Sequence, residues 1–265
     1  MIAALYARGA KTSLIPTVII AAVLAMYTTL ITALYDPDAS AALDAMMKTM
    51  PGLFDAFGMG DDTTTLMGFL LNYLYGFLYV LFPLVLILLL VHRLVIRPID
   101  RGSMAYLLAS PHRRGAVVGT LAAVMLTMLA ALMVFLTVLE FGTAAVLFPD
   151  EQLGIGLLRV NAGLSALWLC MAGLSLLSAC AFRDAAPALW AGGGFVIVEF
   201  VAQMVAQAGD RFKDIRYATF LTLFDRYGLA DGDGTAIWQA VALAVVGVAS
   251  LAAAMTAFVR RDLEV

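Results

Sequence analysis

The chain has 265 residues, of which 63% are hydrophobic and 13% are charged, and its mean hydropathy is +0.96. That composition excludes a water-soluble globule of this length and indicates an integral membrane protein. The net charge of -3 gives no support for nucleic-acid binding, so no nucleic-acid partner is expected.

Six apolar stretches are long enough to cross a membrane. A helix needs about 20 apolar residues to span roughly 30 Å of hydrocarbon. Continuous hydrophobicity favours helices over barrel strands, whose apolar residues alternate in short segments. The expected spans are residues 14–35, 67–91, 116–139, 157–181, 186–206 and 237–259. We therefore predict an all-α integral membrane protein in which residues 1–265 form a single transmembrane domain.

The first span and the acidic segment after it come first in the chain. This span is longer than a signal-peptide core and is followed by no small-residue cleavage pattern, so we expect it to be retained. The segment, residues 36–66, is too short to fold as a domain. Within it, Pro51 is expected to begin a short helix along the outer interface, with Leu53, Phe54 and Phe57 on one side.

A polar stripe marks the second span. Asn72, Tyr75, Tyr79 and Pro83 recur at helical spacing, which places them on one face. One interpretation is that they line a route for an amphipathic substrate. The other is that they form hydrogen bonds between helices or an aromatic belt at the interface. The residues alone leave both interpretations open.

A basic loop joins the second and third spans. Residues 92–114 read HRLVIRPIDRGSMAYLLASPHRR and hold five of the sixteen Lys and Arg residues. Asp100 or Ser103 is expected to cap a short helix, with an apolar face of Met104 and two leucines, that ends at Pro111. Such a helix suits a groove on a soluble partner. The arginines of a cytosolic loop also serve simply as topology anchors.

The third apolar run is too long for one span. As a single helix, residues 116–148 would extend for about 50 Å, which exceeds the hydrocarbon core. We expect a break at Glu140, Gly142 and Thr143, which would leave residues 144–148 as an interfacial stub.

The fifth span also carries a polar stripe, in which Glu199, Gln203 and Gln207 recur every four residues. They either line the same route as the second-span stripe or bond within the protein, and for Glu199, a carboxylate deep in the span, the residues favour neither interpretation. Glycines at residues 192–194 allow another helix to approach closely. A re-entrant or interfacial helix is expected between this span and the last, within residues 208–236.

Charge distribution predicts the orientation. With the N-terminus inside, the inner segments hold ten of the sixteen Lys and Arg residues, whereas the two large outer segments are acidic. The positive-inside tendency therefore places both termini in the cytosol. The expected location is the cytoplasmic (plasma) membrane of a bacterium.

Several chemical motifs are missing from the sequence. It contains no GxxxxGK[ST] phosphate-binding loop, so any ATP and Mg would be bound by another chain. The two histidines, His92 and His112, have no cysteine nearby, and no metal site is expected. No nucleophile and base lie at matched depth in the spans, so we expect no enzyme activity on this chain and no cofactor of its own.

Residues 100–114, DRGSMAYLLASPHRR, resemble the acidic, Gly, two-Leu, Pro, Arg signature on the coupling-helix loop of type-2 ATP-binding-cassette (ABC) exporter permeases. MPGLFDAFG at residues 50–58, FVRRDL at residues 258–263 and the six-span layout look like the same family. The chain departs from the pattern at Ile99 and Asp100, where a paired acidic motif is common, and at Thr120, where a Lys is often found.

The resemblance implies a permease that exports a hydrophobic or amphipathic substrate, such as a drug, an antimicrobial peptide or a lipid. Its partners would be a separate nucleotide-binding ATPase and a second permease chain, in a homodimer or a heterodimer. The implied ATPase-coupling residues are Asp100, Arg101, Gly102, Ser103, Met104, Leu107, Leu108, Pro111, Arg113 and Arg114. The candidates for the translocation pathway are Asn72, Tyr75, Tyr79, Glu199 and Gln203.

Two other functions stay open. An ion-coupled secondary transporter needs intramembrane carboxylates and usually related halves, and here Glu199 stands without a detectable repeat. A non-transporting membrane subunit of an assembly is also compatible, because a coupling-like loop binds a partner whether or not anything crosses the membrane.

Overall fold

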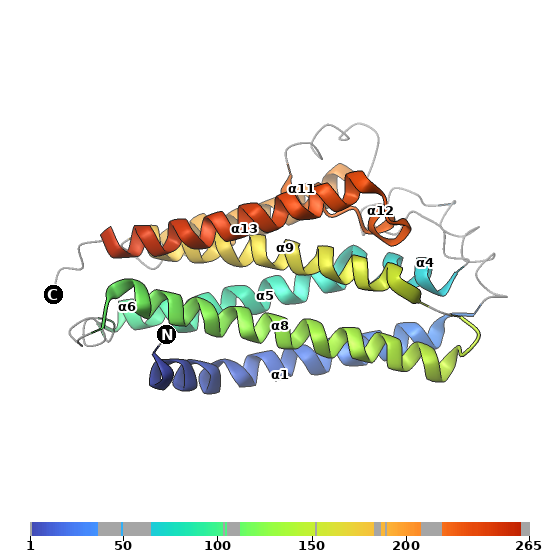
Figure 1. The fold of residues 1–265 in the computed structure, drawn as a ribbon, viewed down its shortest axis with the longest axis horizontal. Coiled ribbons are helices and arrows are strands. Elements are labelled where there is room, and N and C mark those ends of the chain that lie inside the picture. The colour runs from blue at the N-terminus through green and yellow to red at the C-terminus, as the bar shows by residue number, and fades with distance from the viewer. Residues whose placement is uncertain are drawn as a thin grey trace.

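The computed structural model describes residues 2–36, 49, 65–102, 104, 112–151, 153–182, 187–188, 190–207 and 219–260. All regular structure in these ranges is helical, which confirms the all-α prediction. The long helices run side by side along the longest axis of the molecule (Figure 1). Five of them are apolar and long enough to cross a membrane, as an integral membrane protein requires.

The first, third, fourth and last long helices are α1 (Ala3–Leu34), α8 (Arg114–Leu147), α9 (Gly154–Ala181) and α13 (Gly234–Arg260). The second runs from Leu66 to Asp100 through α4 (Leu66–Leu70), η1 (Leu71–Leu78), α5 (Tyr79–Val91), η2 (His92–Ile96) and α6 (Arg97–Asp100). Between α9 and α13 lie η3 (Trp190–Gly194), α11 (Phe195–Gln207), η5 (Phe220–Leu223) and α12 (Arg226–Asp231).

Five of the six expected spans therefore correspond to helices of span length. The expected span at residues 186–206 corresponds to η3 and α11, which form a shorter apolar helix. Its role as a sixth span stays a prediction. The short helices η5 and α12 occupy the segment where an interfacial or re-entrant helix was expected. The expected outer helix after Pro51 lies outside the described residues.

The second long helix was expected to end at Val91, but it continues to Asp100. Its η1 and η2 segments are π-helical, so the backbone is locally wider than an α-helix. Pro98 lies just after η2, and a proline ring in an α-helix clashes with the carbonyl four residues earlier. A π-helical turn before Pro98 relieves this clash. The basic loop consequently begins at Arg101 rather than at His92.

The expected break in the third run was wrong, because α8 continues unbroken through Glu140, Gly142 and Thr143 for 34 residues. The Thr143 hydroxyl donates to the Leu139 carbonyl at 2.9 Å, so it is satisfied within the helix. The Glu140 side chain is bonded inside the protein and needs no exit to water. Residues 144–147 are therefore the last turn of α8 and not a separate stub.

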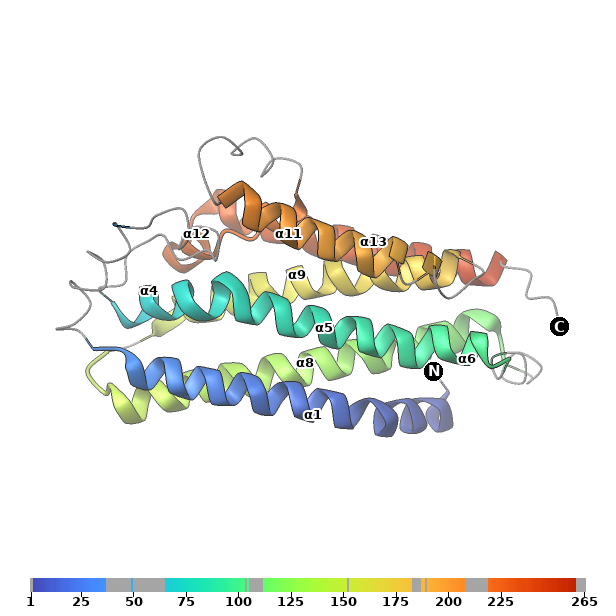
Figure 2. The same ribbon diagram turned by 180° about the vertical axis from the view of Figure 1, so that it is seen from behind.

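The packing has two main pairs, α1 against α8 and α9 against α13, with α5 between them (Figures 1 and 2). The α9 and α13 backbones approach closely at Gly173 and Gly247. A Cβ atom on Gly173 would lie 2.5 Å from the Gly247 carbonyl oxygen. Gly192 likewise faces Ser178 of α9, where a Cβ would lie 2.6 Å from the serine Cβ. The predicted close approach thus occurs at Gly192 against α9 and at Gly193 against Leu88 of α5.

Two prolines inside long helices leave carbonyls that other helices satisfy. Pro83 in α5 has no N–H for the Tyr79 carbonyl, and Trp168 Nε1 of α9 donates to that oxygen at 2.9 Å. Pro16 in α1 leaves the Thr12 carbonyl free in the same way, and Arg93 Nη1 donates to it at 3.4 Å. Each proline thereby ties its helix to a neighbour.

Candidate functional site

The charged residues are divided between the two ends of the bundle. The N-terminus, α6, the start of α8 and the end of α13 lie at one end (Figures 1 and 2). The described basic residues in these segments are Arg8, Lys11, Arg93, Arg97, Arg101, Arg113, Arg114 and Arg260. The segments at the opposite end hold Asp36, Asp150, Glu151, Asp225, Asp231 and Asp233, together with Arg159 and Arg226. We call these the basic end and the acidic end.

The loop expected to couple to an ATPase lies at the basic end, between α6 and α8. Gly102 has a φ of +67°, a conformation that favours glycine, and it turns the chain away from the second long helix. Met104 is buried, at 2% exposure, whereas Asp100 and Arg101 are exposed. Arg113 and Arg114 are exposed at the start of α8.

Four of the proposed coupling residues, Ser103, Leu107, Leu108 and Pro111, lie outside the described residues. The expected capped helix therefore stays a prediction. Thr120, at the position where the resembling family often has a Lys, accepts a hydrogen bond from the Ile2 N–H at 3.0 Å. This contact ties the beginning of the chain to α8 beside the loop.

A buried polar cluster connects the second, third and fourth long helices. The Tyr75 hydroxyl donates to Glu140 Oε1 at 2.8 Å, and Asn161 Nδ2 donates to Glu140 Oε2 at 3.0 Å. Asn161 also donates to the Thr137 hydroxyl at 3.0 Å. Glu140 is wholly buried, and Tyr75 and Asn161 are at most 4% exposed. The carboxyl group is thus held by donors from two neighbouring helices.

The contacts of this cluster can accommodate a proton on the Glu140 carboxyl group. The Tyr75 hydroxyl is also placed to donate to Asn161 Oδ1, although a hydroxyl has only one proton. If the Asn161 amide is reversed, its oxygen faces Glu140 Oε2, and two acceptors lie in contact. Neither orientation of the amide therefore satisfies every contact while Glu140 is ionised. A protonated Glu140 carboxyl satisfies them in either orientation.

The rest of the second-span stripe is also bonded within the chain. The Tyr79 hydroxyl lies 2.7 Å from the Thr28 hydroxyl of α1. Asn72 Oδ1 accepts a hydrogen bond of 3.4 Å from the Tyr227 hydroxyl of α12. Asn72 and Tyr79 are fully buried. These contacts favour the packing interpretation of the stripe over the pathway interpretation.

The second stripe contacts a different part of the molecule. Glu199 Oε2 accepts from the Phe220 N–H at 3.1 Å, and Gln203 Oε1 accepts from the Thr222 hydroxyl at 2.9 Å. The Thr219 hydroxyl donates to the same glutamine oxygen. Glu199 and Gln203 are partly exposed. They hold the beginning of η5 against α11, and nothing is described of the Gln207 side chain.

The structure does not bring the two stripes together along one route. The second-span stripe faces α1, α8, α9 and α12, whereas the α11 stripe faces η5. The second long helix meets α11 elsewhere, where the Phe77 and Phe200 rings lie 5.6 Å apart. The sequence analysis missed the role of Glu140, which it treated as a helix breaker. A carboxylate and an asparagine in adjacent long apolar runs were the available signal.

The arrangement shows no metal chemistry in the part of the chain that is described, where no group of three or more His, Cys, Asp or Glu residues could hold an ion. Both cysteines, Cys170 and Cys180, are buried and form no disulfide. No family model matches the chain, and neither a curated protein nor a solved structure matches it. A functional assignment therefore depends on the residues themselves.

Proposed function

We propose that this chain is the permease subunit of an ABC exporter that moves a hydrophobic or amphipathic substrate across the cytoplasmic membrane. A separate ATPase subunit would bind ATP and Mg and supply the energy. The observation that carries the proposal is the DRGSMAYLLASPHRR loop, which joins two long apolar helices at the basic end.

The helices on either side of this loop support a coupling role. The second long helix runs unbroken from Leu66 to Asp100, and α8 begins at Arg114 and continues to Leu147. A displacement of the loop would therefore act on two helices that each extend for about 50 Å. The π-helical segments η1 and η2 are places where such a helix can adjust, since they are often found at functional positions.

The charge distribution supports the orientation that the proposal needs. Basic residues gather at the end that holds the loop, the beginning of α1 and the end of α13, and the positive-inside tendency places that end in the cytosol. Two such chains, identical or related, would pair in the membrane, and one ATPase would bind to each loop. The substrate would be a drug, an antimicrobial peptide or a lipid.

Gentle solubilisation of the tagged chain from its own cells tests the proposal, followed by mass spectrometry of bound proteins and an ATPase assay. We expect a stoichiometric ATPase that is lost in the Leu107→Asp/Leu108→Asp variant, because the polar groups remove the apolar face that fits the partner. The Leu107→Met/Leu108→Met variant is the matched control and should retain the partner. If the wild-type protein is inserted in the membrane and purifies as an oligomer without any nucleotide-binding protein, the proposal is contradicted.

One observation favours a second candidate, an ion-coupled secondary transporter. Glu140 is a buried carboxyl group whose cluster can accommodate an extra proton, and proton-coupled transporters use such groups. Its position argues against this role, because Glu140 lies only about 10 Å along α8 from Leu147, near the acidic end. Transport that survives ATP depletion but stops when the proton gradient collapses would favour this candidate.

A further inference from the structure

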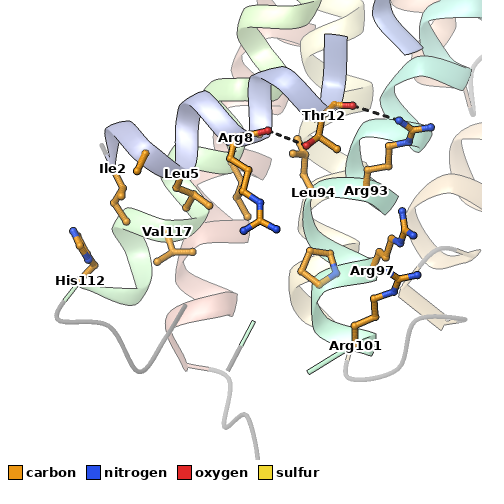
Figure 3. A pocket seen from close by; sticks show the side chains of 14 residues that line it. Ile2, Leu5, Arg8, Thr12, Arg93, Leu94, Arg97, Arg101, His112 and Val117 are labelled. Atoms are coloured by element: carbon orange, nitrogen blue, oxygen red, sulfur yellow. Dashed lines mark hydrogen bonds between the residues drawn. The ribbon is translucent and has the colours of Figure 1, made fainter. Parts of the chain in front are cut away.

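A pocket of about 640 Å³ opens at the basic end between α1, the second long helix and the start of α8. Four arginines line it. Arg8 comes from α1, and Arg93, Arg97 and Arg101 recur every four residues along the second long helix (Figure 3). The spacing places these three on one face of that helix. The volume lies within the usual range of small-molecule sites.

The arginine side chains are available for an external ligand. Within the described residues, no ion pair joins Arg8, Arg97 or Arg101 to a carboxylate, and all three are exposed. Arg93 is half-buried and is held by the Thr12 carbonyl that Pro16 leaves free. The proline in α1 therefore fixes one guanidinium at the wall of the pocket, while the other three remain open. Guanidinium groups bind phosphate oxygens in a two-pronged geometry.

Apart from Thr12 and His112, the remaining lining of the pocket is apolar. It includes Ile2, Leu5, Leu94, Val117 and Leu121. One turn beyond Thr12, α1 exposes Leu14 at 53% and Ile15 at 65%, on the surface that a bilayer would cover. The pocket thus combines a cationic rim with an apolar floor next to a lipid-facing surface. This combination fits a ligand with an anionic head and hydrocarbon chains better than a free anion.

We propose that this pocket binds the phosphate group of an anionic phospholipid from the adjacent membrane leaflet. The headgroup phosphate contacts Arg8 from one side and Arg97 and Arg101 from the other, and the acyl chains lie along α1. The lipid would bridge α1 and the second long helix beside the loop. The binding site belongs to this chain alone and does not depend on the proposed transport function.

Native mass spectrometry of the delipidated chain in detergent tests the proposal, with phosphatidylglycerol, phosphatidylcholine and sodium phosphate as separate probes. We expect phosphatidylglycerol to bind and the other two to fail. Arg8→Gln/Arg97→Gln removes one charge from each side and should weaken phosphatidylglycerol binding by about tenfold or more. Lys11→Gln/Arg260→Gln removes two charges from the same end but outside the pocket, and should change binding by less than about twofold.

Three results would overturn the proposal. They are unchanged lipid binding in the Arg8→Gln/Arg97→Gln variant, an equal loss in the Lys11→Gln/Arg260→Gln control, and phosphate-only binding with the same dependence on Arg8 and Arg97. The last result would assign the pocket to a soluble phosphate compound. If the double variant does not fold, Arg101→Gln on the exposed rim gives the same test, with an expected loss of about fivefold.

Discussion

The two ends of the bundle use their charged side chains in opposite ways. At the acidic end, carboxyl groups accept hydrogen bonds from the same chain. Glu151 accepts from the Tyr35 hydroxyl at 3.0 Å and from the Leu66 N–H at 2.9 Å, and Asp225 caps α12 through the Gly228 N–H at 3.0 Å. At the basic end, Arg8, Arg97 and Arg101 are exposed around an open pocket.

This contrast separates residues that stabilise the fold from residues that are free to bind something else. Polar groups near the acidic end join helices α1, α4, α8 and α9 and end or begin short helices. At the basic end, Arg93 donates to the Thr12 carbonyl, whereas Arg8, Arg97 and Arg101 form no ion pair within the described residues. Substitutions at the acidic end should therefore change stability, and substitutions at the basic end should change binding.

The largest expected effect is at Glu140. Glu140→Ala removes two buried hydrogen bonds, leaves the Tyr75 and Asn161 groups with fewer partners and creates a cavity. We expect the free energy of unfolding in detergent to fall by about 2–3 kcal/mol. Chemical denaturation monitored by tryptophan fluorescence would measure it.

Glu140→Gln is the matched control for this prediction. A neutral glutamine keeps the size of the side chain and resembles the protonated carboxyl group that the cluster can accommodate, so this variant should lose less than about 1 kcal/mol. An equal loss for the Ala and Gln variants would show that the cluster holds an ionised carboxylate. It would also remove the reason to connect Glu140 with a proton.

A smaller effect is expected where Trp168 satisfies the carbonyl that Pro83 leaves free. Trp168→Phe removes the indole N–H and should cost about 1–2 kcal/mol, because the Tyr79 carbonyl loses its donor. Pro83→Ala restores a backbone N–H at residue 83, so the same tryptophan change should cost less in that background. An identical cost in both backgrounds, measured as a double-mutant cycle, would contradict this account.

The smallest effect on stability is expected at the basic end. Arg97→Gln/Arg101→Gln should leave the free energy of unfolding within about 0.5 kcal/mol of the wild type, since both side chains are exposed and have no described ion pair. The same denaturation assay measures it. A loss comparable to that of Glu140→Ala would show that the two ends do not differ in the way proposed.

The sequence predicted the helices well because hydrophobic length is a strong signal, and five spans agree with five long helices. It misplaced the end of the second helix, since the π-helical turn that accommodates Pro98 has no sequence signature. The sequence also predicted a break in α8 at Glu140, because a carboxylate in an apolar run usually marks the place where the chain leaves the membrane for water. Only the partners on other helices, Tyr75 and Asn161, explain why the helix continues.

The candidate site was predicted in part for a similar reason. Helical spacing placed Asn72, Tyr75 and Tyr79 on one face, and all three are buried. It could not show that each would bond to a different helix, because such contacts join residues far apart in the chain. The Arg93, Arg97 and Arg101 row was visible in the sequence, but its pairing with Arg8 across a pocket was not.

The central claim is that the basic end, with its coupling-like loop, faces the cytosol. Arg113→Cys and Asp150→Cys place single reactive thiols at the two exposed ends of α8, and the native cysteines are buried. A membrane-impermeant maleimide applied to intact cells should label the Asp150→Cys variant, and the Arg113→Cys variant only after permeabilisation. If Arg113→Cys is labelled in intact cells while Asp150→Cys is protected, the loop faces the outside of the cell. A cytosolic ATPase could not then bind to it, and the account would be contradicted.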